Sequence, residues 1–294
     1  MHAVFEAIVD YAGLFPPASL TMREAVSAYH GYRNSPDRWM LGRFVAAASR
    51  LTEFGEAVER LGAGATDRAD PWQLSVVTSA ELPADLALIE AFRQRWGERG
   101  IQVDAIEHRV SSREQIGKVG ELVPDDLIPF LEFPSTGPFP ELAAGAAEIG
   151  AHAKIRTGGT TPELFPAAAE LSQFLSAVTA RGVRFKATAG LHHPLRGAFP
   201  LTYDQGAESH TMYGFVNVLL ATAELLRSGE ASTAQQILEE EDPSAITEQD
   251  DAIVWRATRY PFDELARVRE RAFVGFGSCS FREPVDELQW MVVQ

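Results

Sequence analysis

The sequence has 294 residues, 46% of them hydrophobic, which suits one large domain with a full core. Its formal net charge of −15 argues against nucleic acid or an anionic membrane as the main partner. A single cysteine excludes an internal disulfide and a cysteine-cluster metal site. No apolar run approaches the roughly 18 residues of a membrane span, and the first residues lack the basic stretch of a signal peptide. We expect a soluble, cytoplasmic, homo-oligomeric protein that binds a small molecule.

Residues 1–42 precede the first segment with the pattern of a buried strand. They contain an acid and an aromatic residue, Asp10 and Tyr11, and then a helix that we expect to begin at Ser19 or Thr21. We interpret this segment as an N-terminal extension that caps the bottom of the following domain. The alternative interpretation is that the acid or the aromatic residue extends into a functional site.

From residue 43 onward, short apolar or β-branched runs alternate with helical patterns, such as those at Leu82–Trp96 and Pro162–Ala180. Eight strands alternating with helices over about 250 residues predict an α/β fold, a (β/α)8 TIM barrel. A doubly wound open sheet is the alternative, but no Gly-x-Gly-x-x-Gly follows the first strand. The expected strands are 44–49, 73–78, 101–108, 128–133, 151–156, 183–188, 252–256 and 273–277.

A long insertion follows the sixth expected strand, at about 191–250. It begins with a Pro/Gly-rich loop and continues as a helix expected over Thr211–Arg227, with Ser209 as its N-cap. Connections of this length often form lids or subunit contacts. The predicted organisation is therefore the extension 1–42 followed by a barrel over 43–294 that carries this insertion.

Lysine is scarce in this chain, since only Lys118, Lys154 and Lys186 occur among 26 basic residues. Lys154 and Lys186 each lie in a short predicted strand that leads into a glycine turn. Unlike a guanidinium, an amine can lose its proton, attack a carbonyl and form a Schiff base. The pattern indicates that lysine is kept where arginine cannot serve, although arginine-rich codon usage would give the same count.

Ionisable residues gather at the carboxyl ends of the predicted strands, where barrels of this type build their active sites. Burying such groups costs free energy unless they are paired, so their number there favours a functional explanation. The candidate catalytic residues are Glu107, Glu132, Lys154, Lys186 and His192. The candidate substrate-binding residues are Arg156, Thr157, Gly158, Thr188, His193, Gly277, Ser278 and Ser280.

Strand alternation places Lys154 and Arg156 on one face, and Lys186 and Thr188 on one face of the next strand. If both faces point inward, the two ammonium groups come close together. Like charge and burial would then lower the pKa of a lysine toward neutrality, as a nucleophilic amine requires. The alternative is that one or both lysines form ordinary ion pairs with Glu107 or the glutamate of the next strand.

Two short motifs about 30 residues apart, Lys154-Ile-Arg-Thr-Gly-Gly159 and Phe185-Lys-Ala-Thr-Ala-Gly190, resemble those of the deoxyribose-phosphate aldolase group of class I aldolases. That family carries Lys-Thr-Ser-Thr-Gly-Phe on one strand and Val-Lys-Ala-Ser-Gly-Gly on the next. The resemblance implies an aldolase-like TIM barrel in which Lys154 forms a Schiff base and Lys186 tunes its pKa. Gly277-Ser-Cys-Ser280 is similar to the turn on which that family binds phosphate.

The chain also departs from that family. Arg156 stands where the family has a small residue, Ala189 replaces a glycine, and His192-His193-Pro194 has no counterpart. The family's substrate is therefore not carried over. Independently of any family, glycine turns that lead into hydroxyl residues at 158–163 and 277–285 are typical of helix starts that bind phosphate or carboxylate, and ordinary capping explains them equally well.

The leading hypothesis is a lyase that makes or breaks a C–C bond in a small carbonyl metabolite through a lysine Schiff base, with no cofactor. A second hypothesis is a metal-dependent lyase or isomerase, with His192, His193, His210 and a glutamate as ligands to a divalent metal, although no spacing is diagnostic. A third is a barrel without catalysis that acts as a binding subunit. A catalytic cysteine, Cys279 in a glycine turn that would lower its pKa, is a lesser alternative.

Overall fold

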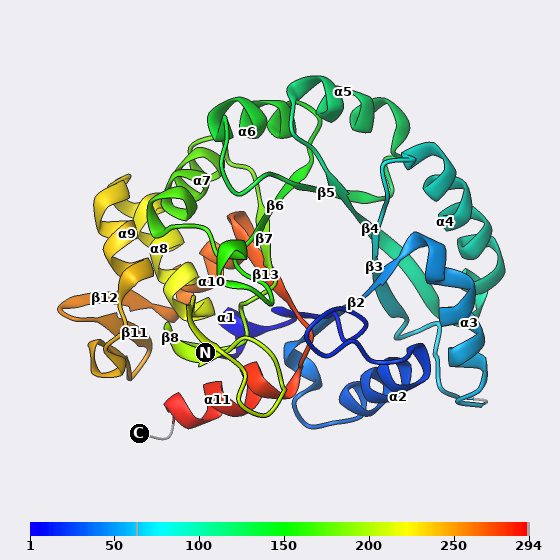
Figure 1. Ribbon diagram of the computed structural model, residues 1–294, viewed down its shortest axis with the longest axis horizontal. Helices are drawn as coiled ribbons and strands as arrows, with labels where there is room; N and C mark the ends of the chain where they lie inside the picture. Colours follow the sequence, from blue (N-terminus) through cyan, green and yellow to red (C-terminus); the bar gives the residue numbers. More distant parts are fainter. Residues whose placement is uncertain (63, 293–294) are drawn as a thin grey trace.

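The computed structural model describes residues 1–62 and 64–292. Eight parallel strands close into a barrel in the order β1-β13-β7-β6-β5-β4-β3-β2, seen end-on in Figure 1. This closed order confirms the predicted (β/α)8 TIM barrel and excludes an open doubly wound sheet. The strands are β1 (Val9–Tyr11), β2 (Leu41–Ala47), β3 (Trp72–Val77), β4 (Ile101–Arg109), β5 (Ile128–Glu132), β6 (His152–Arg156), β7 (Phe185–Thr188) and β13 (Phe273–Ser278).

Helices surround the barrel (Figure 1), and their buried residues are mainly apolar. Helix α2 begins where the sequence predicts, because Thr21 and Glu24 form a capping box at its start. The helices are α1 (His2–Phe5), α2 (Met22–Arg33), α3 (Leu51–Glu59), α4 (Leu82–Trp96), α5 (Arg113–Leu122), α6 (Phe139–Glu148), α7 (Ala168–Ala180), α8 (Phe215–Ser228), α9 (Ala231–Glu239), α10 (Phe262–Arg271) and α11 (Arg282–Val292). Short 3-10 turns are η1 (Arg38–Met40), η2 (Ala48–Arg50), η3 (Gly97–Arg99), η4 (Pro162–Leu164) and η5 (Pro243–Ala245).

The first barrel strand comes from the N-terminal segment. Strand β1 pairs in parallel with β13 on one side and with β2 on the other, and Asp10 lies opposite Gly277. The sequence predicted that the barrel begins at residue 43. The structure corrects this boundary, because β1 lies before residue 43 and is a strand of the barrel. A strand of three residues, all buried, is too short to show either alternation or a long apolar run.

The expected strand at 252–256 lies outside the barrel. It forms β11 (Ala252–Trp255), which pairs antiparallel with β10 (Ile246–Gln249) and β12 (Thr258–Pro261) in a separate three-stranded sheet. All four residues of β11 are buried. An apolar run shows that a strand is covered on both faces, but not which sheet it joins, and this is why the sequence misplaced it.

The long connection after β7 opens with a hairpin of β8 (Gly197–Pro200) and β9 (Ser209–Met212). The helix expected over Thr211–Arg227 begins only at Phe215, because the preceding residues pair with β8 and Gly214 precedes the helix. Similarly, the helix expected over Pro162–Ala180 is divided into η4 and α7, since Pro166 cannot continue a helix.

The core has a large aromatic component between the strands and the outer helices. Tyr29 of α2, Phe54 of α3 and Trp72 of β3 are nearly inaccessible. The ring centroid of Trp72 lies 5.0 Å from that of Tyr29 and 6.2 Å from that of Phe54. This packing fixes the strand positions, and through them the side chains at the carboxyl ends. Among residues 1–62 and 64–292, none of the helices is long and apolar enough to cross a membrane.

Candidate active site

A cavity of about 310 Å³ opens at the carboxyl ends of the barrel strands. Part of its wall is polar and comes mainly from the ends of β4, β5, β6 and β7, and the rest of its wall is mainly apolar. The polar wall includes Glu107, Arg109, Glu132, Lys154, Arg156, Thr188 and His192. The apolar wall includes Ala12, Phe15, Pro16, Val45, Val77, Leu164 and Ala189. A cavity with a few convergent polar groups on an apolar background is typical of a small-molecule site.

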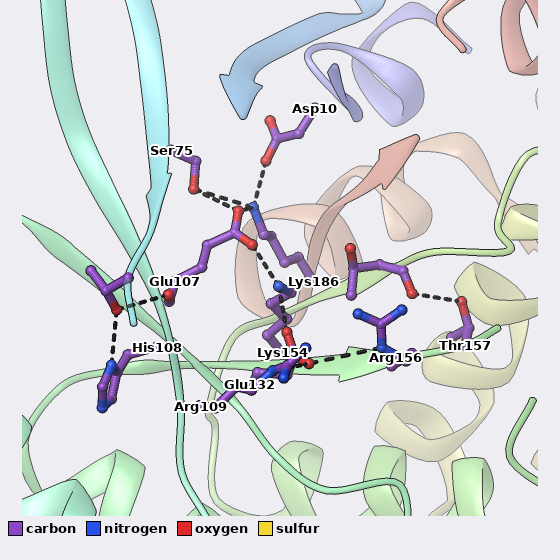
Figure 2. A network of polar contacts seen from close by, with 12 residues as sticks. Asp10, Ser75, Glu107, His108, Arg109, Glu132, Lys154, Arg156, Thr157 and Lys186 are labelled. Carbon is purple, nitrogen blue, oxygen red and sulfur yellow. Dashed lines mark hydrogen bonds and ion pairs between the residues drawn. The ribbon is translucent and has the colours of Figure 1, made fainter. Parts of the chain in front are cut away.

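Lys154 reaches the cavity from β6 and lies between two carboxylates. Its Nζ is 2.6 Å from Glu107 Oε2 and 2.6 Å from Glu132 Oε2, as Figure 2 shows. Lys154 is only 4% exposed, yet it contributes to the cavity wall. Its amine therefore combines burial, charge partners and access to a bound molecule.

Lys186 lies behind this group and is not part of the cavity lining in the described structure. Its Nζ lies 2.8 Å from Asp10 Oδ2 and donates to Glu107 Oε1, so Glu107 contacts one lysine with each oxygen (Figure 2). The ammonium also lies 4.7 Å from the centre of the Phe130 ring.

Both lysines form the ion pairs with glutamates that the alternative interpretation describes, and this pairing decides the charge of Lys186. Burial disfavours the ammonium of Lys186, but attraction to Asp10 and Glu107 outweighs it and raises the pKa of Lys186 above its ordinary value. Burial likewise disfavours the Glu107 carboxylate, but attraction to Lys154 and Lys186 keeps its pKa well below the usual range. Lys186 is therefore held as a cation.

Two arginines stand at the rim beside Glu132. Arg109 Nε is 3.2 Å and Arg156 Nε is 3.9 Å from Glu132 Oε1, and the Arg109 side chain is 78% exposed. Burial acts to raise the pKa of Glu132, but Lys154, Arg156 and Arg109 lower it overall. These guanidinium groups give the mouth of the cavity a positive edge that suits a carboxylate or phosphate.

His192 enters the cavity wall from the segment after β7. Its Nδ1 lies 3.0 Å from Ser278 Oγ and 3.1 Å from Glu283 Oε2, so the carboxyl end of β13 and the start of α11 hold the ring. Ser280 Oγ accepts from the backbone N–H of Glu283 at 3.2 Å, which makes it a cap of α11.

The remaining candidate residues have other surroundings. Gly277 and Thr188 line the cavity. Buried Thr157 donates to the carbonyl of Ala189 at 2.6 Å, and Gly158 packs against the ring of Phe165. Both therefore shape the turn after β6 from below the cavity surface.

The histidines of the metal hypothesis have different partners, although the ring centroids of His192 and His193 lie 6.3 Å apart. His193 Nδ1 is 2.8 Å from Glu287 Oε2 and its ring stacks on Phe199, whereas His210 packs against Phe165. Within the described ranges, no group of three or more His, Cys, Asp or Glu side chains is arranged to hold a metal ion. The expected lowering of the Cys279 thiol pKa is wrong, since burial raises it.

Three residues of this region were not among the sequence candidates. Asp10 was considered only as an alternative, and its signal was an acid within an apolar run. Ser75 donates to Glu107 Oε1 at 2.7 Å, but a serine inside a strand gives no signal by itself. Glu283 lies beyond the barrel strands, so only the folded chain brings it to His192.

Fold and site together define a (β/α)8 barrel with a buried lysine–carboxylate cluster at the carboxyl ends of its strands. No family model matches the chain, and no curated protein matches it. Among solved structures, the chain is similar to a fructose-bisphosphate aldolase from Slackia heliotrinireducens, with 14% sequence identity and a TM-score of 0.36. The match covers 82% of this chain and 89% of that chain.

Proposed function

We propose that the protein is a lyase that makes or breaks a C–C bond of a small carbonyl metabolite through a Schiff base on Lys154. The observation that carries the proposal is the position of the Lys154 amine, in a cavity wall and 2.6 Å from each of two carboxylates. The position of Lys186 behind that wall, among the described residues, supports Lys154 over Lys186 as the nucleophile.

The chemistry begins with loss of a proton from the Lys154 ammonium to the solvent, which leaves the two neighbouring carboxylates ionised. The free amine attacks the carbonyl carbon, the carbonyl oxygen takes up one proton from the nitrogen and a second from the solvent, and water leaves to give a protonated iminium ion. Ammonium and iminium carry the same charge, so Glu107 and Glu132 stabilise both. When the C–C bond breaks, its electron pair forms an enamine and the iminium nitrogen becomes neutral.

Lys186 acts indirectly in this scheme. It binds the second oxygen of Glu107 and keeps that carboxylate ionised beside the reacting nitrogen. Arg109 and Arg156 at the rim favour a substrate with a carboxylate or phosphate group, while the apolar wall accommodates its carbon chain. No cofactor is needed for this route, because the iminium ion formed from the Lys154 amine is the electron sink.

Borohydride trapping tests the proposal. The protein is incubated with sodium borohydride and, in turn, small aldehydes, ketones and 2-oxo acids, and the reduced adduct is located by peptide mass spectrometry. With only three lysines in the chain, each lies in a distinguishable peptide. We expect one adduct, on Lys154, in the wild type and in the matched control Lys118→Arg, whose lysine pairs with Glu114 at the surface.

The same adduct is expected to be absent from Lys154→Arg. Labelling confined to Lys118 or the N-terminal amine, or equal labelling in Lys154→Arg, would refute the proposal.

A further inference from the structure

A chain of hydrogen bonds leads from the cavity wall to the surface hairpin of β8 and β9. His192 Nδ1 is 3.1 Å from Glu283 Oε2, and the Tyr203 hydroxyl donates to the same oxygen at 3.0 Å. His192 comes from the loop after β7, Glu283 from the first turn of α11, and Tyr203 from the hairpin loop. His192 and Tyr203, from two different segments, therefore both contact the Glu283 carboxylate of a third segment.

This contact fixes the tautomer of the imidazole. Burial acts to raise the pKa of Glu283, but its hydrogen bonds to His192 and Tyr203 lower it overall, so it is a carboxylate that can only accept. Nδ1 must therefore carry the proton that it shares with Glu283. Nε2 has no hydrogen-bond partner among the described residues, so its lone pair is free to take a proton.

The same geometry argues against a serine nucleophile. Ser278 Oγ and Glu283 both approach Nδ1, and the protonated nitrogen cannot serve as the base for a hydroxyl. In a nucleophilic triad the hydroxyl and the carboxylate contact opposite ring nitrogens. Ser278 thus helps to hold the ring, and the functional nitrogen is the one that neither residue contacts.

The carboxylates near Lys154 are poorly suited to remove a proton from carbon. Glu107 is held by both lysines, and burial is outweighed by their attraction so that its pKa lies well below the ordinary range. The pKa of Glu132 is also lowered. Imidazole, by contrast, is the side chain that most often exchanges protons near neutral pH. His192 is the histidine that shares the cavity with Lys154.

We propose that His192 is the proton-transfer group for the substrate carbon next to the Lys154 iminium, and that Glu283 and Tyr203 are the positioning residues that hold its tautomer. This inference rests on the proposed Schiff-base function. In the step, Nε2 takes a proton from the carbon adjacent to the iminium. The C–H electron pair forms the C=C bond, and the iminium π pair moves to nitrogen, which gives a neutral enamine and an imidazolium. Return of a proton to carbon reverses the step.

Solvent exchange measures that step without knowledge of the natural reaction. Each carbonyl compound that labels Lys154 is incubated with the enzyme in deuterium oxide, and the loss of its α-proton signal is followed by NMR. We expect His192→Asn to lower the exchange rate about 100-fold and Glu283→Gln at least about tenfold, while borohydride labelling of Lys154 persists in both. Tyr203→Phe is expected to give a smaller loss, since Glu283 still contacts the ring.

Glu287→Gln is the matched control. Glu287 lies one helical turn beyond Glu283 on α11 and makes the same kind of contact, 2.8 Å, to His193. Exchange in this variant should stay within about twofold of the wild type. In addition, ¹H–¹⁵N spectra of the ring should show the Nδ1–H tautomer of His192 in the wild type and a mixture in Glu283→Gln.

The outcomes separate the two proposals. A wild-type protein without an adduct on Lys154 overturns the proposed function and, with it, the step assigned to His192. If Lys154 is labelled normally and Glu283→Gln and Glu287→Gln exchange at equal rates, Glu283 does not position His192. This outcome leaves the proposed function standing. Normal exchange in a folded His192→Asn variant assigns the proton transfer to another group and overturns this inference while leaving the Schiff base intact.

Discussion

Lys154 and Lys186 are register partners on the adjacent parallel strands β6 and β7. Both are buried, and a direct contact of two ammonium groups would be unfavourable. Glu107 separates the two positive charges, because each of its carboxylate oxygens contacts one lysine. Asp10 adds a second carboxylate contact to Lys186, and Glu132 adds one to Lys154. The two lysines are therefore coupled through a shared anion.

This arrangement predicts unequal effects of two identical substitutions. Lys154→Arg should abolish turnover while the protein stays folded, because a guanidinium keeps the charge but cannot form a Schiff base. Lys186→Arg should lower the rate less and shift its pH optimum, because a cation still faces Glu107. Steady-state rates, with circular dichroism as a check on folding, would measure both. Near-normal turnover of Lys154→Arg would contradict covalent catalysis at this residue.

Removing the inner charge altogether should destabilise the barrel. Lys186→Met would leave Asp10 and Glu107 with one buried cation fewer, and breaking a buried pair costs about 3–5 kcal/mol. Urea unfolding of the wild type, Lys186→Met and the surface control Lys118→Met would measure the change. An equal, small loss in both variants would show that the buried pairing contributes little.

The depressed pKa of Glu107 predicts loss of stability in acid. Burial favours the protonated form, but the two lysines outweigh it, so the folded protein binds fewer protons here than the unfolded chain. The stabilisation is present above the ordinary value of 4.5 and is lost as the pH falls below it. The free energy of unfolding should therefore drop between about pH 5 and about pH 3. Glu107→Gln should be less stable at about pH 7 and show a smaller drop, and parallel curves would argue against this assignment.

We expect the purified protein to contain less than about one equivalent of divalent metal and to keep its activity in the presence of a chelator. The reason is that His192, His193 and His210 contact different neighbours and, within the described residues, belong to no group that could hold a metal ion. Metal analysis of the purified protein and assays with and without EDTA would test this. Stoichiometric zinc, manganese or magnesium, with activity lost to EDTA, would favour the metal-dependent hypothesis instead.

The segment 192–210 is expected to become more ordered when a ligand binds. It includes His192 at the cavity and Tyr203, whose side chain is 55% exposed in the hairpin loop. Closure of such connections over a substrate would reduce backbone hydrogen exchange. Hydrogen exchange with and without a compound that labels Lys154 would measure it. Unchanged protection throughout the segment would count against a lid.

The sequence by itself determined the fold class and seven of the eight barrel strands, because buried parallel strands alternate with amphipathic helices in a regular way. It also pointed to Lys154 and Lys186, since a scarce residue at two similar strand ends is a local signal. The strand β1 could not be predicted, because three residues are too few to show a strand pattern.

Only the tertiary structure decided how these residues combine. Closing the barrel brings Asp10 into contact with Lys186, which is 176 residues away in the sequence. It also brings Glu283, at the start of α11, into contact with His192, 91 residues away. The tertiary structure also decided that carboxylates separate the two lysines, and their attraction raises the pKa of Lys186 although burial acts to lower it. Such contacts depend on strand order and register. A sequence alone does not reveal them, because burial, charge and hydrogen bonding act between residues that become neighbours only in the folded chain.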